Sequence, residues 1–184
     1  MTIDSGKTII LDMNGETLSI GFSDSSKNLI VNNGTLTITG DGTFDATEAT
    51  SYKGFINNYG TLTVENGTFQ IADKAMTVHL RNQDGGKAVI NGGTFSGGAT
   101  IVRSFEGSNT TITGGSFTNS VYPAVDVNGE TLITGGIFTN TSCSRCDSQN
   151  WGYTVRSGVD NDPDAKLTIT PSSEGSVVVT GTQG

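Results

Sequence analysis

Short apolar segments alternate with polar residues along almost the whole chain. Between residues 67 and 93, three such segments follow one another, at 68–71, 76–81 and 87–90. Within each of them apolar and polar residues alternate with a period of two, which is the pattern of a β-strand with one buried face. Gly, Asn and Asp separate the segments, as tight turns require. The pattern therefore predicts three short strands in each unit of the chain.

This unit repeats along the sequence. An aliphatic residue, a Gly-containing turn and a Phe recur at Ile38–Phe44, Val64–Phe69, Ile90–Phe95, Ile112–Phe117 and Ile133–Phe138. Successive Phe residues lie 21 to 26 positions apart, and degraded copies occupy 18–20, 167–169 and 177–179. A unit of this size cannot bury a core alone, but stacked copies form one continuous core.

The repeat predicts an all-β fold, a right-handed parallel β-helix (β-solenoid) with three strands per coil and about six to seven coils. In the third strand of each coil we expect these pairs to face inward: Leu36/Ile38, Leu62/Val64, Ala88/Ile90, Thr110/Ile112, Thr131/Ile133 and Leu167/Ile169. We expect one domain, 1–184, with a loop insertion at 139–151 that projects from the stack. The alternative, a β-sandwich of hairpins, explains the alternation but not the nearly fixed spacing of the Gly-Gly-x-Phe corners.

Composition supports this interpretation and excludes several classes of protein. Thr, Gly and Asn number 28, 26 and 15 of 184 residues, and only 33% of residues are hydrophobic. Gly and Asn suit the corners and Thr the outer strand faces. No apolar run reaches the roughly 18 residues of a membrane-spanning helix. The net charge of −8 makes nucleic acid an unfavourable partner.

The repeats Gly34–Gly40 and Asn91–Phe95 resemble those of pectin-lyase-like right-handed β-helix proteins, which are common on bacterial surfaces and in phages. The resemblance covers about residues 3 to 180. It implies an architecture that hosts lyases, hydrolases, adhesins and phage tailspikes alike. No catalytic motif of the lyases or hydrolases has a counterpart here, so we predict no catalytic residue.

The outward face of the second strands carries the main candidate binding site. Alignment of these strands predicts a column with neighbours about 4.8 Å apart, formed by Asn32, Asn57, Arg81, Arg103, Asn128 and Arg156, with His79 and Asp126 beside it. Arginine donates fork-like hydrogen bonds, so the column suits an anionic or hydroxylated glycan. The alternative is a solvated ladder in which Asp126 pairs with Arg103 or Arg156.

The predicted insertion holds the remaining candidates. Cys143 and Cys146 suit a local disulfide or two free thiols, because the chain lacks the further ligands that a zinc site needs. Trp151, the single Trp, is a candidate contact residue, or it covers the base of the loop. We predict no metal and no cofactor.

These observations favour a non-catalytic structural or display protein, from a phage virion or a bacterial surface, that binds a partner protein or a glycan. The alternatives are a polysaccharide lyase or hydrolase, which would need more carboxylates than Asp126 on the face, and an ice-binding protein with Thr-x-Thr ladders. No secretory signal precedes the first strand, so we expect a virion-borne protein or an excised domain that acts outside the cell. No amphipathic helix caps the stack, so another chain, or a second copy, is expected at one or both ends.

Overall fold

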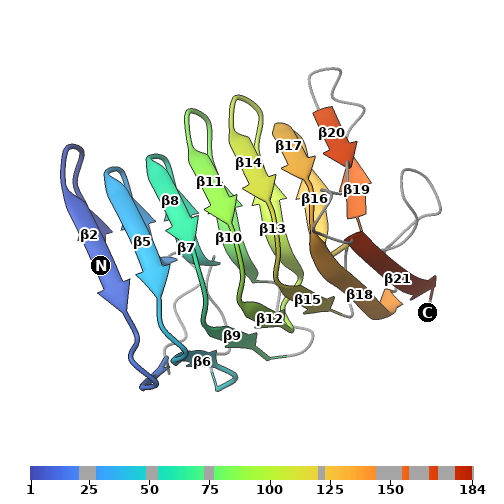
Figure 1. Cartoon of the computed structure of the whole chain (residues 1–184), viewed down its shortest axis with the longest axis horizontal. Helices are drawn as coiled ribbons and strands as arrows, with labels where there is room; N and C mark the ends of the chain where they lie inside the picture. Colours follow the sequence, from blue (N-terminus) through green and yellow to red (C-terminus); the bar gives the residue numbers. More distant parts are fainter. Residues whose placement is uncertain are drawn as a thin grey trace.

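The computed structural model describes residues 1–20, 28–48, 54–72, 77–119, 123–143, 155–157, 166–169 and 177–183. In this part of the chain the secondary structure consists of 21 β-strands, which form three seven-stranded sheets. Each turn of the chain contributes one strand to each sheet, and the turns stack along one axis (Figure 1).

The three sheets take every third strand. The first sheet contains β1 (Thr2–Ile3), β4 (Asn28–Asn32), β7 (Gly54–Asn58), β10 (Val78–Asn82), β13 (Thr100–Ser104), β16 (Val125–Val127) and β19 (Val155–Ser157). The second contains β2 (Thr8–Asp12), β5 (Thr35–Thr39), β8 (Thr61–Val64), β11 (Lys87–Ile90), β14 (Asn109–Ile112), β17 (Glu130–Ile133) and β20 (Lys166–Ile169). The third contains β3 (Thr17–Ser19), β6 (Thr43–Ala46), β9 (Thr68–Ile71), β12 (Thr94–Ser96), β15 (Ser116–Asn119), β18 (Gly136–Cys143) and β21 (Val177–Gln183).

The predicted parallel β-solenoid with three strands per coil is confirmed. Neighbouring strands pair in parallel in all three sheets, for example β8 with β11 and β11 with β14. A β-sandwich of hairpins would pair its strands antiparallel, so that alternative is wrong. One predicted boundary also differs, because residues 139–143 belong to β18, which pairs with β21, and not to a projecting loop.

The interior is built from columns of matching side chains. In the second sheet the predicted inward pairs are in register, and those from Leu36/Ile38 to Thr131/Ile133 are at most 2% exposed. In the third sheet Phe44, Phe69, Phe95, Phe117 and Phe138 form a continuous stack, with ring centroids 4.6–5.1 Å apart and nearly parallel planes. Each coil thus adds one Phe to a column that no single coil could bury.

A ladder of buried amides lies where the first sheet turns into the second. The Nδ2 of Asn32 donates to Oδ1 of Asn58 at 2.7 Å, and the Nδ2 of Asn58 donates to Oδ1 of Asn82 at 2.8 Å. All three side chains are fully buried. Each also donates through Nδ2 to a backbone carbonyl in a turn or at the start of the strand that follows it, so the ladder satisfies polar groups that the corner removes from water.

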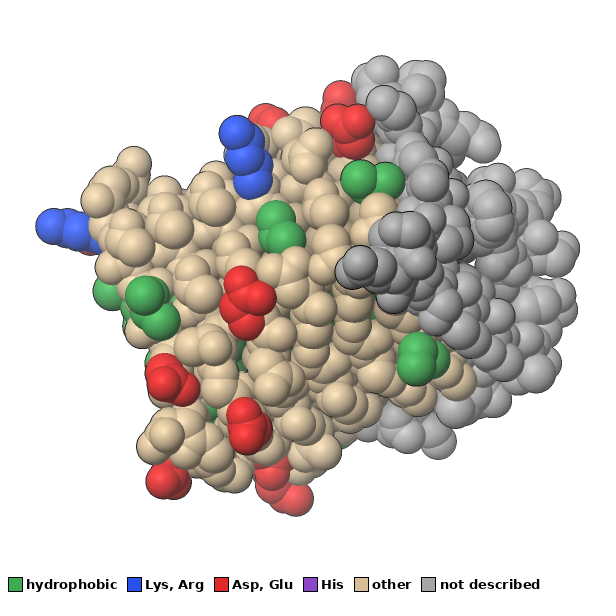
Figure 2. All heavy atoms as spheres, in the orientation of Figure 1, with side chains coloured by type: hydrophobic (Ala, Val, Ile, Leu, Met, Phe, Trp, Pro, Cys, Tyr) green, Lys and Arg blue, Asp and Glu red, His purple; other side chains and the backbone are tan. Residues whose placement is uncertain are grey.

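The outer faces of the second and third sheets are largely neutral and polar. Figure 2 shows the side of the molecule that carries β2, β5, β8, β11 and β14, where charged side chains are scattered among neutral ones. On the third sheet, Thr17, Thr43, Thr68, Thr94 and Ser116 form one outward column in register. The described residues include no helix long and apolar enough to cross a membrane.

Candidate functional site on the outward face of the first sheet

The first sheet places Arg81 and Arg103 in one outward column. Asn57, Arg81, Arg103 and Asp126 follow one another in register on neighbouring strands, and Arg156 of β19 comes next. The adjacency of Arg81 and Arg103 is as predicted. Asp126 lies in the column itself, where we expected Asn128, and Val31 occupies the place predicted for Asn32.

Turn length bears on the error at Asn128 but not on that at Asn32, because the turns after Asn32 and after its register partner Asn58 both have two residues. Between β4 and β17, the first and second sheets are joined by two-residue turns at 33–34, 59–60 and 128–129, but by four-residue turns at 83–86 and 105–108. In each four-residue turn the amide of the fourth turn residue donates to the carbonyl of the first turn residue, at 2.8 Å in 83–86 and 3.0 Å in 105–108. The third turn residue is a Gly at φ 74° in both. Asn128 therefore begins a turn, and Asn32 points inward to the amide ladder.

Residues two positions after the column form a second outward row on the same face. The amides of Tyr59, Gln83, Phe105 and Asn128 each donate to the last strand residue of the preceding coil, at 2.8 Å. These four residues are therefore equivalent in successive coils. Tyr59 is 46% exposed, and the Nε2 of Gln83 donates to Oδ1 of Asn57 at 2.6 Å. The face thus combines guanidinium, amide and aromatic groups.

Two arginines share one aromatic ring at the centre of this face. The guanidinium carbons of Arg81 and Arg103 both lie 5.0 Å from the centroid of Phe105. This distance is within the range of a cation–π interaction. A Cβ at Gly54 would lie 3.3 Å from Cδ of Arg81, so the glycine leaves room for the arginine stem. We call Arg81, Arg103 and Phe105 the arginine–phenylalanine cluster.

The positive charges of the two guanidinium groups are compensated to different extents by nearby carboxylates. Nε of Arg103 lies 3.6 Å from Oδ2 of Asp126, which is too long for a hydrogen bond, and this buried Nε has no hydrogen-bond partner. Within the described residues, no carboxylate lies within ion-pair distance of Arg81. Burial, followed by repulsion from Arg103, lowers the pKa of Arg81, and Tyr59 acts in the opposite direction. Arg81 stays charged at neutral pH because an arginine pKa starts so high.

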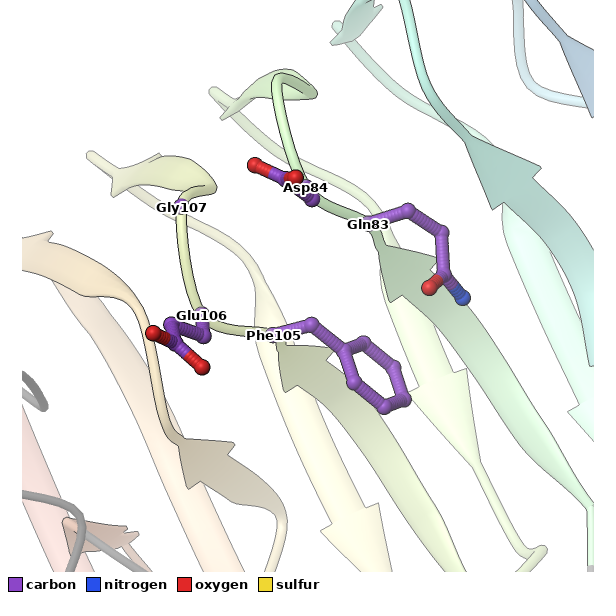
Figure 3. Close-up of a pocket in the computed structure, with 5 residues that line it drawn as sticks. All are labelled: Gln83, Asp84, Phe105, Glu106 and Gly107. Atoms are coloured by element: carbon purple, nitrogen blue, oxygen red, sulfur yellow. The ribbon is translucent and has the colours of Figure 1, made fainter.

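A hollow of about 660 Å³ opens between the two long turns, beside the cluster. Gln83, Asp84, Phe105, Glu106 and Gly107 line it (Figure 3). Figure 3 shows Gln83 and Phe105 pointing to one side of the turns and Asp84 and Glu106 to the other. The sequence reasoning missed all five. The signal that could have revealed them is the spacing of six residues from Arg81 to Lys87 and from Arg103 to Asn109, against four from Asn57 to Thr61.

His79, predicted on the outward face, is instead buried in the core. It is 1% exposed, and its ring centroid lies 5.4 Å from that of Phe55 and 6.0 Å from that of Phe95. Its Nε2 lies 3.2 Å from the carbonyl oxygen of Gly97, while Nδ1 has no hydrogen-bond partner. Burial lowers the pKa of His79 to about 4, so the ring is neutral at physiological pH.

The strict alternation of sides fails at the start of these strands, which explains the error. In β13 the amides of Ile101 and Val102 both donate to the carbonyl of Ala124, so two consecutive residues oppose one. Both side chains are fully buried. His79 and Leu80 occupy the matching positions of β10, between residues in register with Thr100 and Ser104, and both are buried as well.

The other predicted residues are placed only in part. Cys143 is the last residue of β18, and Arg156 lies in β19 in register with Asp126. Cys146 and Trp151 lie outside the described residues. The described residues contain no group of three or more His, Cys, Asp or Glu side chains that could hold a metal ion.

Comparison with protein-family models, curated proteins and solved structures finds no match for this chain. The β-solenoid architecture is therefore established by the arrangement of its own strands. The likeness to pectin-lyase-like proteins rests on the repeats alone.

Proposed function

We propose that this chain is a non-catalytic display or attachment module that binds a glycan through the outward face of its first sheet. The observation that carries the proposal is the arginine–phenylalanine cluster, flanked by the hydrogen-bonded amides of Asn57 and Gln83 and by exposed Tyr59. Aromatic rings, amides and guanidinium groups are the side chains that pack on sugar rings and bond to their hydroxyls. The hollow beside the cluster gives a ligand a concave surface.

The rigidity of the scaffold favours this role. Successive strands repeat about every 4.8 Å, so groups on neighbouring coils face an extended ligand at regular intervals. Because the cluster stands on paired strands and short turns, binding would cost little ordering of the protein. The repeats resemble those of surface and phage proteins, so we place the module outside the cell, on a virion or a bacterial surface.

We also propose that another chain docks at the N-terminal end of the described stack. Ile9 and Leu18 are 38% and 43% exposed, whereas their register partners in the next coil, Leu36 and Phe44, are at most 1% exposed. A docked chain would bury this apolar surface. Sedimentation of the protein and of Ile9→Asp tests the proposal, because the substitution should weaken any association. A chain that stays monomeric at high concentration, with and without candidate surface proteins, would contradict it.

A glycan array combined with an assay for released reducing sugar tests the main proposal. We expect binding without release. Arg81→Gln and Tyr59→Ala should each reduce the signal, while Lys87→Gln, which removes a positive charge from the second sheet, should retain it. An array on which no glycan binds above background would count against a glycan-binding role.

A polysaccharide-cleaving enzyme is the second candidate, and one observation favours it. Asp84 and Glu106 occupy equivalent positions in adjacent long turns and both line the hollow. Glycoside hydrolysis uses two carboxylates, one as acid and one as base or nucleophile. Release of reducing sugar that is abolished by Asp84→Asn or Glu106→Gln would replace the binding module with an enzyme. Loss of turnover in Asp126→Asn alone would place the chemistry in the arginine column instead.

A further inference from the structure

The arginine–phenylalanine cluster holds two cations against one aromatic ring. Arg81 and Arg103 lie in register on adjacent strands, whose backbones are about 4.8 Å apart. Both guanidinium carbons are 5.0 Å from the same ring, that of Phe105. Like charges repel, so this arrangement needs either compensating anions or contacts that keep the two side chains in place. The ring of Phe105 supplies part of those contacts.

The protein supplies little compensation at this place. Asp126 approaches Arg103 only at 3.6 Å, and no carboxylate of the described residues is within ion-pair distance of Arg81. The chain as a whole carries a net charge of −8, so two adjacent cations with a single ion-paired carboxylate, Asp126, are unlike its general surface. A ligand anion would restore the balance.

The number and shape of the donors indicate what kind of anion fits. A planar carboxylate fills one guanidinium fork with its two oxygens. A tetrahedral ester has non-bridging oxygens that point in different directions, so it can accept hydrogen bonds from two arginines on adjacent strands. Exposed Asp84 and Glu106 line the hollow beside Phe105, so a ligand that also enters the hollow meets negative charge there, which disfavours a second negative charge on the ligand.

We propose that the glycan bound by this face carries a monoanionic tetrahedral ester, a sulfate ester or a phosphodiester, which bridges Arg81 and Arg103. This inference rests on the proposed glycan binding. Phe105 is a positioning residue, because it acts on the ligand through the two guanidinium groups that pack on its ring. The site recognises the feature that sulfate esters and phosphodiesters share, which is a single negative charge on a tetrahedral group.

Matched polysaccharides test the inference by isothermal titration calorimetry. The probes are one polysaccharide in sulfated, desulfated and carboxylated forms, and a phosphodiester-linked glycan polymer of similar length. We expect the sulfated form, the phosphodiester polymer or both to bind at least about 10-fold more tightly than the desulfated form, as hydrogen bonds to charged groups imply. The preference between the two esters identifies the source of the anion.

Variants connect the preference to the cluster. Arg81→Gln and Arg103→Gln should each remove most of the difference between the sulfated and desulfated forms, and Lys87→Gln should keep it. Phe105→Leu should reduce the preference for the ester, whereas Phe105→Tyr, which keeps the ring, should restore it. Circular dichroism of each variant verifies that the β-solenoid is folded.

The outcomes separate this inference from the proposed function. Equal affinity for the sulfated and desulfated forms, or tighter binding of the carboxylated form, overturns the inference and leaves glycan binding intact. Binding of none of the probes, together with an empty glycan array, overturns both.

Discussion

The interior of the third sheet and the exterior of the first sheet follow opposite rules. Inside the third sheet the same residue, Phe, returns in five consecutive coils, and its rings stack at 4.6–5.1 Å. On the outside of the first sheet no single residue type is kept, since the column runs from Asn57 through two arginines, Arg81 and Arg103, to Asp126. Both columns have the same strand spacing, so geometry does not cause the difference.

The difference indicates where the molecule has stability and where it has specificity. A stack of identical rings is stable because each ring inside the stack packs against two others. The outward column combines amide, guanidinium and carboxylate groups, and its two adjacent cations repel each other. Packing selects the same side chain in each coil of the interior column. The outward column departs from such a repeat at the coils that carry the arginine–phenylalanine cluster.

Phe95→Ala should produce the largest effect, because Phe95 lies in the middle of the stack between Phe69 and Phe117. Removal of a buried aromatic ring typically costs about 3–5 kcal/mol of unfolding free energy. Chemical denaturation measures this loss, and Thr94→Ala, on the outward side of the same strand, is the control, with a change within about 0.5 kcal/mol. Similar losses in both variants would refute the special role of the interior column.

His79 gives the interior of the protein a pH dependence. The folded protein holds the ring neutral with its pKa lowered to about 4, whereas the unfolded chain has the ordinary value of 6.5. Protonation therefore favours the unfolded chain, so stability is complete above pH 6.5 and declines as the pH falls toward 4. The loss from this group should be on the order of 3 kcal/mol.

The difference between the wild type and His79→Phe isolates this term, since the carboxylates titrate in both proteins. Urea denaturation at pH 7 and at pH 4.5 should show a smaller decline in the variant. Parallel pH profiles would mean that His79 is protonated without cost and that water reaches its ring.

Asn58→Ala tests the amide ladder at the boundary between interior and exterior. Asn58 donates to Asn82 and accepts from Asn32, so its removal leaves buried polar groups on both sides without their partner. We expect a loss of about 1–3 kcal/mol, measured by thermal and chemical unfolding. Asn33→Ala, at an exposed turn position one residue after the ladder residue Asn32, should have little effect. If the two variants are equally stable, the ladder contributes no net stability.

The same contrast explains what the sequence could predict. The repeat in the sequence revealed the inward pairs of the second sheet, such as Leu62 and Val64, because packing selects the same kind of residue in each coil. Turn lengths vary without disturbing that packing, so the Asn128 and Asp126 positions could not be aligned by counting apolar residues. His79 was misplaced for a different reason, since two consecutive residues face the core at the start of the strand. Phe105 and the hollow were missed because they lie in turns, where the repeat imposes least.

Arg81→Gln should produce the smallest effect on stability. The substitution removes one cation–π contact, worth about 0.5–1 kcal/mol at such a site. It also removes a half-buried charge that Arg103 repels, and these contributions have opposite signs. We therefore expect the unfolding free energy to stay within about 1 kcal/mol of the wild type, by chemical denaturation at low and at high salt. Because salt screens the repulsion between exposed charges, any stabilisation by the variant should shrink as salt is added. A loss of unfolding free energy above about 2 kcal/mol would mean that Arg81 contributes substantially to stability. The outward column would then be selected for stability, as the interior column is. A neutral result would leave recognition of a ligand as the reason why two cations share one ring.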